Sequence, residues 1–299
     1  MWIFIAVAGY SFLAFESVAS KFLLAGRLKS WQLYTFYIGF FSVFSLILTP
    51  FGLQWRGTMP FTLSLFSGVI FYLSLVLLFQ SLLTSSTTRV YILYGTVTTL
   101  GTLVLAKIFL RENASFQEIL GIFFLIGGGI LISFKFYRSR FFSNYQKTIA
   151  AGLLAALSLV ILKYAYGEQN FVSGYIISRM GIFATALLSL TIPSFREVIA
   201  RNIRQRKKKE NLFNLAGTVG AKTLAGIGTL LIHYSIFLGN VTVVNALVST
   251  QYALIFIFSI IFSLYLKKIF VERLTWSNTL IKTVGIVLVA VGTALVTTM

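Results

Sequence analysis

Apolar residues gather into ten long runs along the chain, separated by short polar or basic connectors. A helix needs about 20 mainly apolar residues to cross a membrane, and its backbone must satisfy its hydrogen bonds internally because no water is available there. Each run has roughly that length. The pattern therefore predicts an all-α integral membrane protein with ten transmembrane helices, at 2–24, 31–53, 61–83, 88–110, 116–136, 148–166, 172–193, 213–238, 241–266 and 276–297.

The longest polar interruption is the connector 194–211, between the seventh and eighth predicted spans. It contains seven lysines and arginines and is strongly basic. Its apolar residues recur at helical spacing, namely Phe195, Val198, Ile199 and Ile203. This pattern fits an amphipathic helix lying on anionic lipid and, equally, a solvated linker.

The two halves of the chain resemble each other. The segment around Lys21 resembles the segment around Lys163 at an offset of 142 residues, and the turn at Glu112 resembles the turn at Glu272. Each of these glutamates precedes the glycine-bearing last helix of its half. An internal repeat of this kind indicates that the chain contains one structural unit twice.

We therefore predict two five-helix repeats, 1–140 and 141–299. In their last helices, Gly121 and Gly128 correspond to Gly285 and Gly292. Because five is an odd number, the second repeat must enter the membrane upside down relative to the first. Inverted repeats are typical of secondary transporters, which handle substrate between the halves by alternating access.

Composition narrows the class further. The chain of 299 residues is 58% hydrophobic and only 11% charged, which excludes a disordered or ordinary soluble protein. Its seven acidic residues are all glutamate, and it has one histidine and no cysteine. The chain therefore has few of the side chains that metal sites and hydrolase active sites require. We expect no enzyme activity, no catalytic residue, no metal and no cofactor.

The net charge of +18 resides mostly in the connectors. Lysines and arginines between apolar spans fit anionic lipid headgroups, so we expect membrane lipids and not nucleic acid as partners. They are concentrated after the odd-numbered spans, which predicts cytoplasmic odd connectors and both termini outside.

Glu16 is the one acid in the middle of an apolar run. An intramembrane charge costs about 2.5–3.5 kcal/mol on insertion scales and indicates a functional site with a partner. Lys222 lies too deep in the eighth span to reach the interface easily, so it is a candidate partner for Glu16. His233 in the same span could relay a proton, although a lone histidine is more often a packing residue.

Polar side chains also form helical stripes in three of the predicted spans. Tyr94 belongs to one in the fourth span, Asn245, Gln251 and Tyr252 lie in the ninth, and Lys222 and His233 are in the eighth. These stripes predict a shared substrate cavity. The competing interpretation is that the smaller residues among them form ordinary helix-packing seams.

Three segments carry a family resemblance. The turns Leu110-Arg111-Glu112-Asn113 and Glu272-Arg273-Leu274-Thr275, and the tract 243–252, resemble the drug/metabolite transporter superfamily, with two copies of its EamA domain. The resemblance covers nearly the whole chain. It implies a ten-helix secondary transporter, often an exporter of amino acids, other small metabolites or drugs. The chain lacks the family's proline early in the fourth and ninth helices, and family members commonly have cytoplasmic termini.

The leading hypothesis is a secondary active transporter that exports a small organic solute across a prokaryotic plasma membrane. The sequence does not predict the oligomeric state of the protein. No ATP-binding loop occurs, so a gradient would supply the energy. A second hypothesis is an exchanger of an anionic solute such as a sugar phosphate or nucleotide-sugar, held by intramembrane cations: Lys21, Lys163, Arg179 and Lys222. A third, of another class, is a lipid-handling or scaffold protein.

Overall fold

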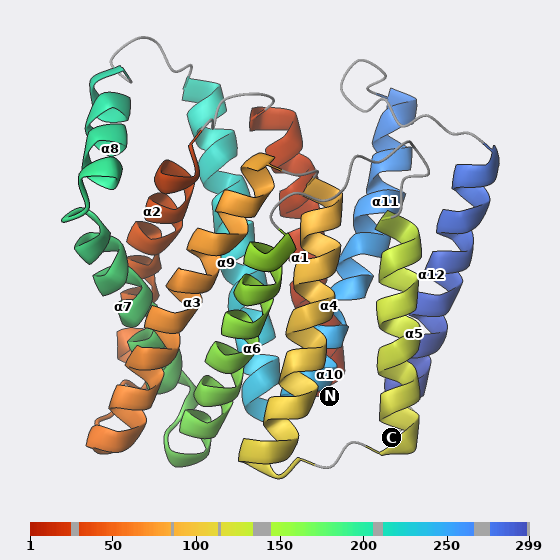
Figure 1. The fold of residues 1–299 in the computed structure, drawn as a ribbon, viewed down its shortest axis with the longest axis horizontal. Helices are drawn as coiled ribbons and strands as arrows, with labels where there is room; N and C mark the ends of the chain where they lie inside the picture. Colours follow the sequence, from red (N-terminus) through yellow and green to blue (C-terminus); the bar gives the residue numbers. More distant parts are fainter. Residues whose placement is uncertain are drawn as a thin grey trace. The chain divides into compact units, whose positions relative to one another are not determined.

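The computed structural model describes residues 1–24, 30–84, 87–112, 115–133, 145–205, 212–265 and 276–297, and nearly all of these are helical (Figure 1). Within the described part, six segments are long and apolar enough to cross a membrane. Four further helices contain shorter apolar stretches. The chain therefore has the character of a multi-pass membrane protein. The predicted turn at 272–275 and residues 206–211 of the basic connector lie outside the described residues.

The helices form two compact units, and each unit takes segments from both halves of the chain. Unit 1 contains α1 (Trp2–Leu24), α5 (Phe116–Ser133), α9 (Leu212–Leu238), α10 (Val241–Ala246), α11 (Val248–Tyr265) and α12 (Trp276–Thr297). Unit 2 contains α2 (Trp31–Phe41), the 3₁₀-helix η1 (Ser42–Phe51), α3 (Thr58–Thr84), α4 (Thr87–Leu105), the π-helix η2 (Ala106–Leu110), α6 (Tyr145–Glu168), α7 (Phe171–Ser189) and α8 (Pro193–Gln205).

Polar caps start several of these helices. Before α5, the Ser115 hydroxyl accepts from the Glu118 amide at 3.1 Å, and the Glu118 carboxylate accepts from the Ser115 amide at 2.8 Å. This reciprocal pair satisfies two donors that the helix leaves open. Asn170 caps α7 and Asn240 caps α10, each with a side-chain oxygen that accepts hydrogen bonds from backbone amides of the first turn.

Two close helix crossings organise unit 1. Helices α1 and α9 meet at Gly9 and Gly228, where a Cβ on either residue would lie within 3 Å of the other's carbonyl oxygen. Helices α5 and α12, which lie side by side in Figure 1, meet at two glycine pairs, Gly121 with Gly292 and Gly128 with Gly285. Without side chains at these points the backbones pack in direct contact, which is how membrane helices gain van der Waals stabilisation.

Unit 2 is built around α3, which packs against both α6 and α7. At the α3–α6 seam, the buried Ser67 hydroxyl donates to the Ser158 carbonyl at 3.0 Å, and the Ser158 hydroxyl donates to the Ser67 carbonyl at 2.9 Å. At the α3–α7 seam, a Cβ on Gly68 would collide with the Ser178 carbonyl. Small and hydroxyl-bearing residues therefore set both helix spacings.

Helix α8 resolves the two interpretations of the basic connector. Phe195 and Ile199 on its apolar face are buried at 4% and 5% exposure against Leu33 and Phe36 of α2. The Tyr37 hydroxyl of α2 also donates to Asn202 at 3.3 Å. The predicted amphipathic helix is present, but its apolar face is covered by protein within unit 2.

The ninth predicted span differs from the expectation of one continuous helix. Its helical hydrogen bonding is interrupted at Leu247, between α10 and α11. The Thr250 amide and hydroxyl both bond to the Leu247 carbonyl, at 2.9 and 2.7 Å, and so tighten the turn after the break.

Candidate functional site

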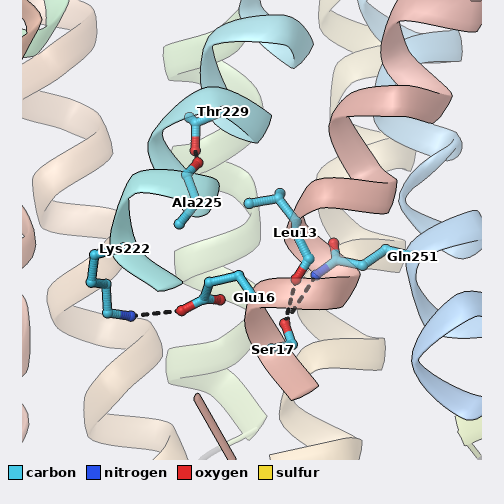
Figure 2. A network of polar contacts seen from close by, with 7 residues as sticks. All are labelled: Leu13, Glu16, Ser17, Lys222, Ala225, Thr229 and Gln251. Carbon is cyan, nitrogen blue, oxygen red and sulfur yellow. Dashed lines mark hydrogen bonds and ion pairs between the residues drawn. The ribbon is translucent and has the colours of Figure 1, made fainter. Parts of the chain in front are cut away.

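An ion pair joins α1 to α9 inside unit 1. Lys222 Nζ lies 2.8 Å from Glu16 Oε1 (Figure 2). The carboxylate is the more enclosed partner, with 13% of the Glu16 side chain exposed against 41% for Lys222. The pairing predicted from the depth of the two residues in their spans is therefore present, and the ammonium forms its accessible side.

The Gly9–Gly228 crossing explains why these two side chains meet. Glu16 follows Gly9 by seven residues and Lys222 precedes Gly228 by six, so both lie about two turns from the crossing on antiparallel helices. At the other end of the same pair of helices, the Ser235 hydroxyl donates to the Trp2 carbonyl at 2.7 Å. Backbone contact at the glycines brings the charged side chains within hydrogen-bonding distance.

The site extends to α11 through the residue after Glu16. Gln251 Nε2 donates a long hydrogen bond of 3.5 Å to the Ser17 hydroxyl, which itself donates to the Leu13 carbonyl at 2.8 Å (Figure 2). Gln251, a candidate site residue from the sequence, thus lies beside the Glu16 segment. Three helices of unit 1 contribute polar groups to one locality.

This arrangement permits competition for either charge. A solute ammonium could take the place of Lys222 on the carboxylate, and a solute anion could take the place of Glu16 on the ammonium. A proton on Glu16 would remove the charge attraction altogether. Because the pair is neutral as a whole, each exchange changes the net charge of the locality and can be coupled to movement of an ion.

Asn245 and Tyr252 lie on either side of the helix break. The Asn245 Nδ2 atom is buried and has no hydrogen-bond partner among the described residues. Tyr252 and the buried Ser249 pack against α5, where a Cβ on Gly129 would lie 2.8 Å from the Ser249 hydroxyl. Asn245 is therefore available for a ligand, whereas the Ser249 face has the character of a packing seam.

His233, the candidate proton relay, makes a hydrogen-bonding contact within its own helix. Its Nδ1 atom is 2.9 Å from the Thr229 carbonyl of its own helix. The Thr229 hydroxyl likewise bonds to the Ala225 carbonyl, at 2.6 Å, one turn earlier (Figure 2). These contacts fit the alternative interpretation of a hydrogen-bonded helix residue.

Tyr94 belongs to unit 2, and the other six predicted site residues belong to unit 1. Its hydroxyl is 3.5 Å from the Ser74 hydroxyl, which donates to the Ala151 carbonyl of α6 at 2.8 Å. The Tyr94 ring packs against a core cluster that includes Leu78 and Val90. Within its unit, Tyr94 serves the α3–α4–α6 core.

Sequence reasoning gave Lys163 and Arg179 only a secondary role, and the structure places both among polar neighbours in unit 2. The Lys163 ammonium interacts electrostatically with Glu112, and the Arg179 guanidinium lies 4.9 Å from the centre of the Tyr175 ring. The side chain of Lys21, another predicted cation, is outside the described residues. No group of His, Cys, Asp or Glu within the described ranges could hold a metal ion.

Two structural features, one in each unit, were not predicted from the sequence. The break at Leu247 contains neither proline nor glycine, so no residue in the sequence marks it. The Ser67–Ser158 pair in unit 2 was also not predicted, although Ser158 lies at the offset of 142 residues from Glu16 that the predicted repeat uses.

Comparison with known proteins establishes a shared fold alone. A crystal structure, described only as that of a protein, superposes with a TM-score of 0.68 over 99% of this chain and 96% of the other, at 14% sequence identity. No model of a protein family matches the chain, and no curated protein matches it.

Proposed function

We propose that the protein is a secondary active transporter that exports a small organic solute, such as an amino-acid-like metabolite or a drug, across a prokaryotic plasma membrane. In this proposal ten transmembrane helices form two inverted five-helix repeats, as in the drug/metabolite transporter superfamily that the sequence resembles. The protein would act by alternating access and without catalytic chemistry.

The observation that carries the proposal is the matching set of helix contacts in the two units. In unit 1, α1 packs against α9 and α11; in unit 2, α6 packs against α3 and α4. If the first helix of each half corresponds to the first helix of the other, these are equivalent groups of three. Helices α3 and α9, which correspond in this scheme, both have 27 residues.

The α5–α12 crossing supports the same relation. Gly121 corresponds to Gly285 and Gly128 to Gly292 in the sequence repeat, yet Gly121 contacts Gly292 and Gly128 contacts Gly285. This exchange of partners is the property of an isologous, two-fold contact between equivalent elements. A two-fold axis between the last helices of the halves is what an inverted repeat requires.

Within this architecture, the Glu16–Lys222 pair supplies a substrate or coupling site. Ser158, which lies at the offset of 142 residues from Glu16, sits at the α3–α6 seam and donates to the Ser67 carbonyl. A charge pair on one side of a symmetric frame gives the transporter one titratable carboxylate at which proton and substrate can compete.

The proposal is tested first by finding a ligand and then by measuring its transport. Purified protein is screened by thermal unfolding against amino acids, small metabolites and drugs, because a ligand at about 100 times its dissociation constant adds about 2.7 kcal/mol of stability. Each stabilising compound is then measured in radiolabelled form, by counterflow into proteoliposomes at several pH values.

We expect saturable counterflow in the parent and at least a tenfold lower rate, about 1.4 kcal/mol in barrier height, in Glu16→Gln. Glu197→Gln is the matched control, because Glu197 is an exposed carboxylate on α8 in the other unit. It should transport like the parent. Stabilising compounds that never exceed empty liposomes would contradict transport, and unchanged rates for Glu16→Gln at every pH would contradict the coupling role.

A further inference from the structure

Helix α8 begins close to the end of a membrane-length helix. Its first residue, Pro193, follows the last residue of α7, Ser189, by four positions. Helix α7 is long and apolar enough to cross a membrane, whereas the 13 residues of α8 include three arginines and one glutamate. Four residues extend by at most about 14 Å, so α8 starts near the membrane surface at which α7 ends.

The apolar face of α8 is covered by protein. Phe195 and Ile199 are buried in one core cluster with residues of α2, and Trp31 at the start of α2 meets the Phe195 ring edge-on with ring centres 5.2 Å apart. An amphipathic helix at a membrane surface binds lipid through the apolar area that it inserts and through its charge. Because α2 covers the apolar side chains of α8, the charge is what this helix can offer to lipid.

The opposite face of α8 is exposed and carries charged side chains. Its exposed residues are Arg196, Glu197, Ala200 and Arg201, which the helical period of 3.6 residues places on the side away from Phe195. Neither guanidinium group on this face forms a hydrogen bond or an ion pair with another described residue. Both arginines can therefore attract an anion from outside the chain.

The charge of this part of the chain is strongly positive. Residues 194–211 contain seven lysines and arginines against two glutamates. Arg204 belongs to the last turn of α8, and four further cations follow the helix directly in the sequence, at 206–209. Clusters of about four to eight lysines and arginines next to a transmembrane helix typically bind anionic lipid headgroups. An anionic lipid surface therefore matches α8 in both charge and position.

We propose that the exposed face of α8 binds anionic phospholipid headgroups by charge alone, without insertion of the helix into the bilayer. Arg196 and Arg201 supply the attraction from the described part of this face. Since no apolar area is inserted, the attraction should be screened by salt, over a distance of about 10 Å at 0.1 M. The surface lies wholly in unit 2, and the proposal does not depend on the Glu16–Lys222 pair or on transport.

The test measures which lipids gather beside α8 in the full-length protein. The chain has no cysteine, so Ala200→Cys provides a single thiol on the exposed face for a neutral fluorophore. The labelled protein is reconstituted in phosphatidylcholine vesicles with a trace of either phosphatidylglycerol or phosphatidylcholine that carries an acceptor dye on its acyl chain. We expect more energy transfer to phosphatidylglycerol than to phosphatidylcholine at about 20 mM salt, and equal transfer at about 500 mM.

Variants in the labelled background assign this preference to α8. Arg196→Gln and Arg201→Gln should each lower the ratio of the two lipid association constants about fivefold, which corresponds to about 1 kcal/mol per charge. Arg201→Lys keeps the charge and should stay within about twofold of the labelled parent. Both positions are exposed, so these changes should leave the fold intact.

Arg56→Gln is the matched control. Arg56 is an exposed arginine of the same unit that lies beyond the end of the membrane-length segment Trp31–Phe51, whereas α8 contacts the start of that segment. This variant should keep the preference of the labelled parent. Equal transfer to both lipids at low salt would overturn the proposal and favour an acidic protein as the occupant of this face. A preference that persists at about 500 mM salt, or that neither Arg196→Gln nor Arg201→Gln lowers, would also overturn it.

Discussion

The close contact of α5 with α12 makes a quantitative prediction about two neighbouring glycines. In Gly128→Ala, the new Cβ would lie 2.7 Å from the Gly285 carbonyl oxygen and 2.9 Å from the Val289 amide nitrogen. Both are backbone atoms of α12, so the overlap can be relieved only if the two helices separate. Overpacking of this kind typically costs about 1–3 kcal/mol.

Gly127→Ala is the matched control, because a Cβ there would meet nothing within 4 Å. Alanine favours a helix over glycine by about 0.8–1.0 kcal/mol, so this variant should be as stable as the parent or slightly more stable. The same gain applies to Gly128→Ala, so the two variants should differ by the overpacking cost alone, about 1–3 kcal/mol, although they add the same methyl group to adjacent residues.

The assay is reversible unfolding in mixed dodecylmaltoside and dodecylsulfate micelles, followed by circular dichroism. Gly292→Ala should cost the same as Gly128→Ala, because its Cβ would lie 2.8 Å from the Gly121 carbonyl oxygen and 2.9 Å from the Leu125 amide nitrogen. Equal stabilities of Gly127→Ala and Gly128→Ala would refute the packing argument. A large difference between Gly128→Ala and Gly292→Ala would refute the two-fold relation.

Two further predictions concern unit 2 and use the same unfolding measurement. Ser158→Ala removes one of the reciprocal α3–α6 hydrogen bonds and should lower the free energy of unfolding by about 0.6 kcal/mol, up to about 1.7. Ser42→Ala should cost less, because the Ser42 hydroxyl bonds within its own helical segment. The reverse order would contradict a stabilising role for the α3–α6 hydrogen bonds. Phe195→Ala should lower the free energy of unfolding by about 3–5 kcal/mol, because Phe195 is 4% exposed. Leu188→Ala should lower it by about 0.5 kcal/mol or less, because Leu188 is 66% exposed. Similar losses of stability in the two variants would mean that α8 does not pack on α2.

The Glu16–Lys222 pair was predictable from sequence because charge is so costly in an apolar span. Only a few charged residues lie deep in the predicted helices, and each must find a partner or water. Depth and scarcity reduced the choice of partner to very few residues. The same reasoning could not decide the role of Tyr94, because a tyrosine is equally suited to a packed core and to a ligand-binding site.

The remaining features depend on tertiary contacts that a local pattern does not encode. The amphipathic spacing of α8 indicates that one face of the helix is covered. The sequence pattern would be the same whether lipid or α2 covered that face. The break at Leu247 occurs in a run of ordinary helix-compatible residues, Asn245 to Ser249. Packing, and not a proline or glycine, must therefore determine where α10 ends.

The distance in sequence between Glu16 and Lys222 has a consequence for biosynthesis. The two residues are 206 positions apart, and a ribosome adds about 5–20 residues per second, so α9 follows α1 by about 10–40 s. During that interval the carboxylate enters the membrane before its ammonium partner exists. We expect the newly made first helix to remain near the insertion machinery until Lys222 arrives.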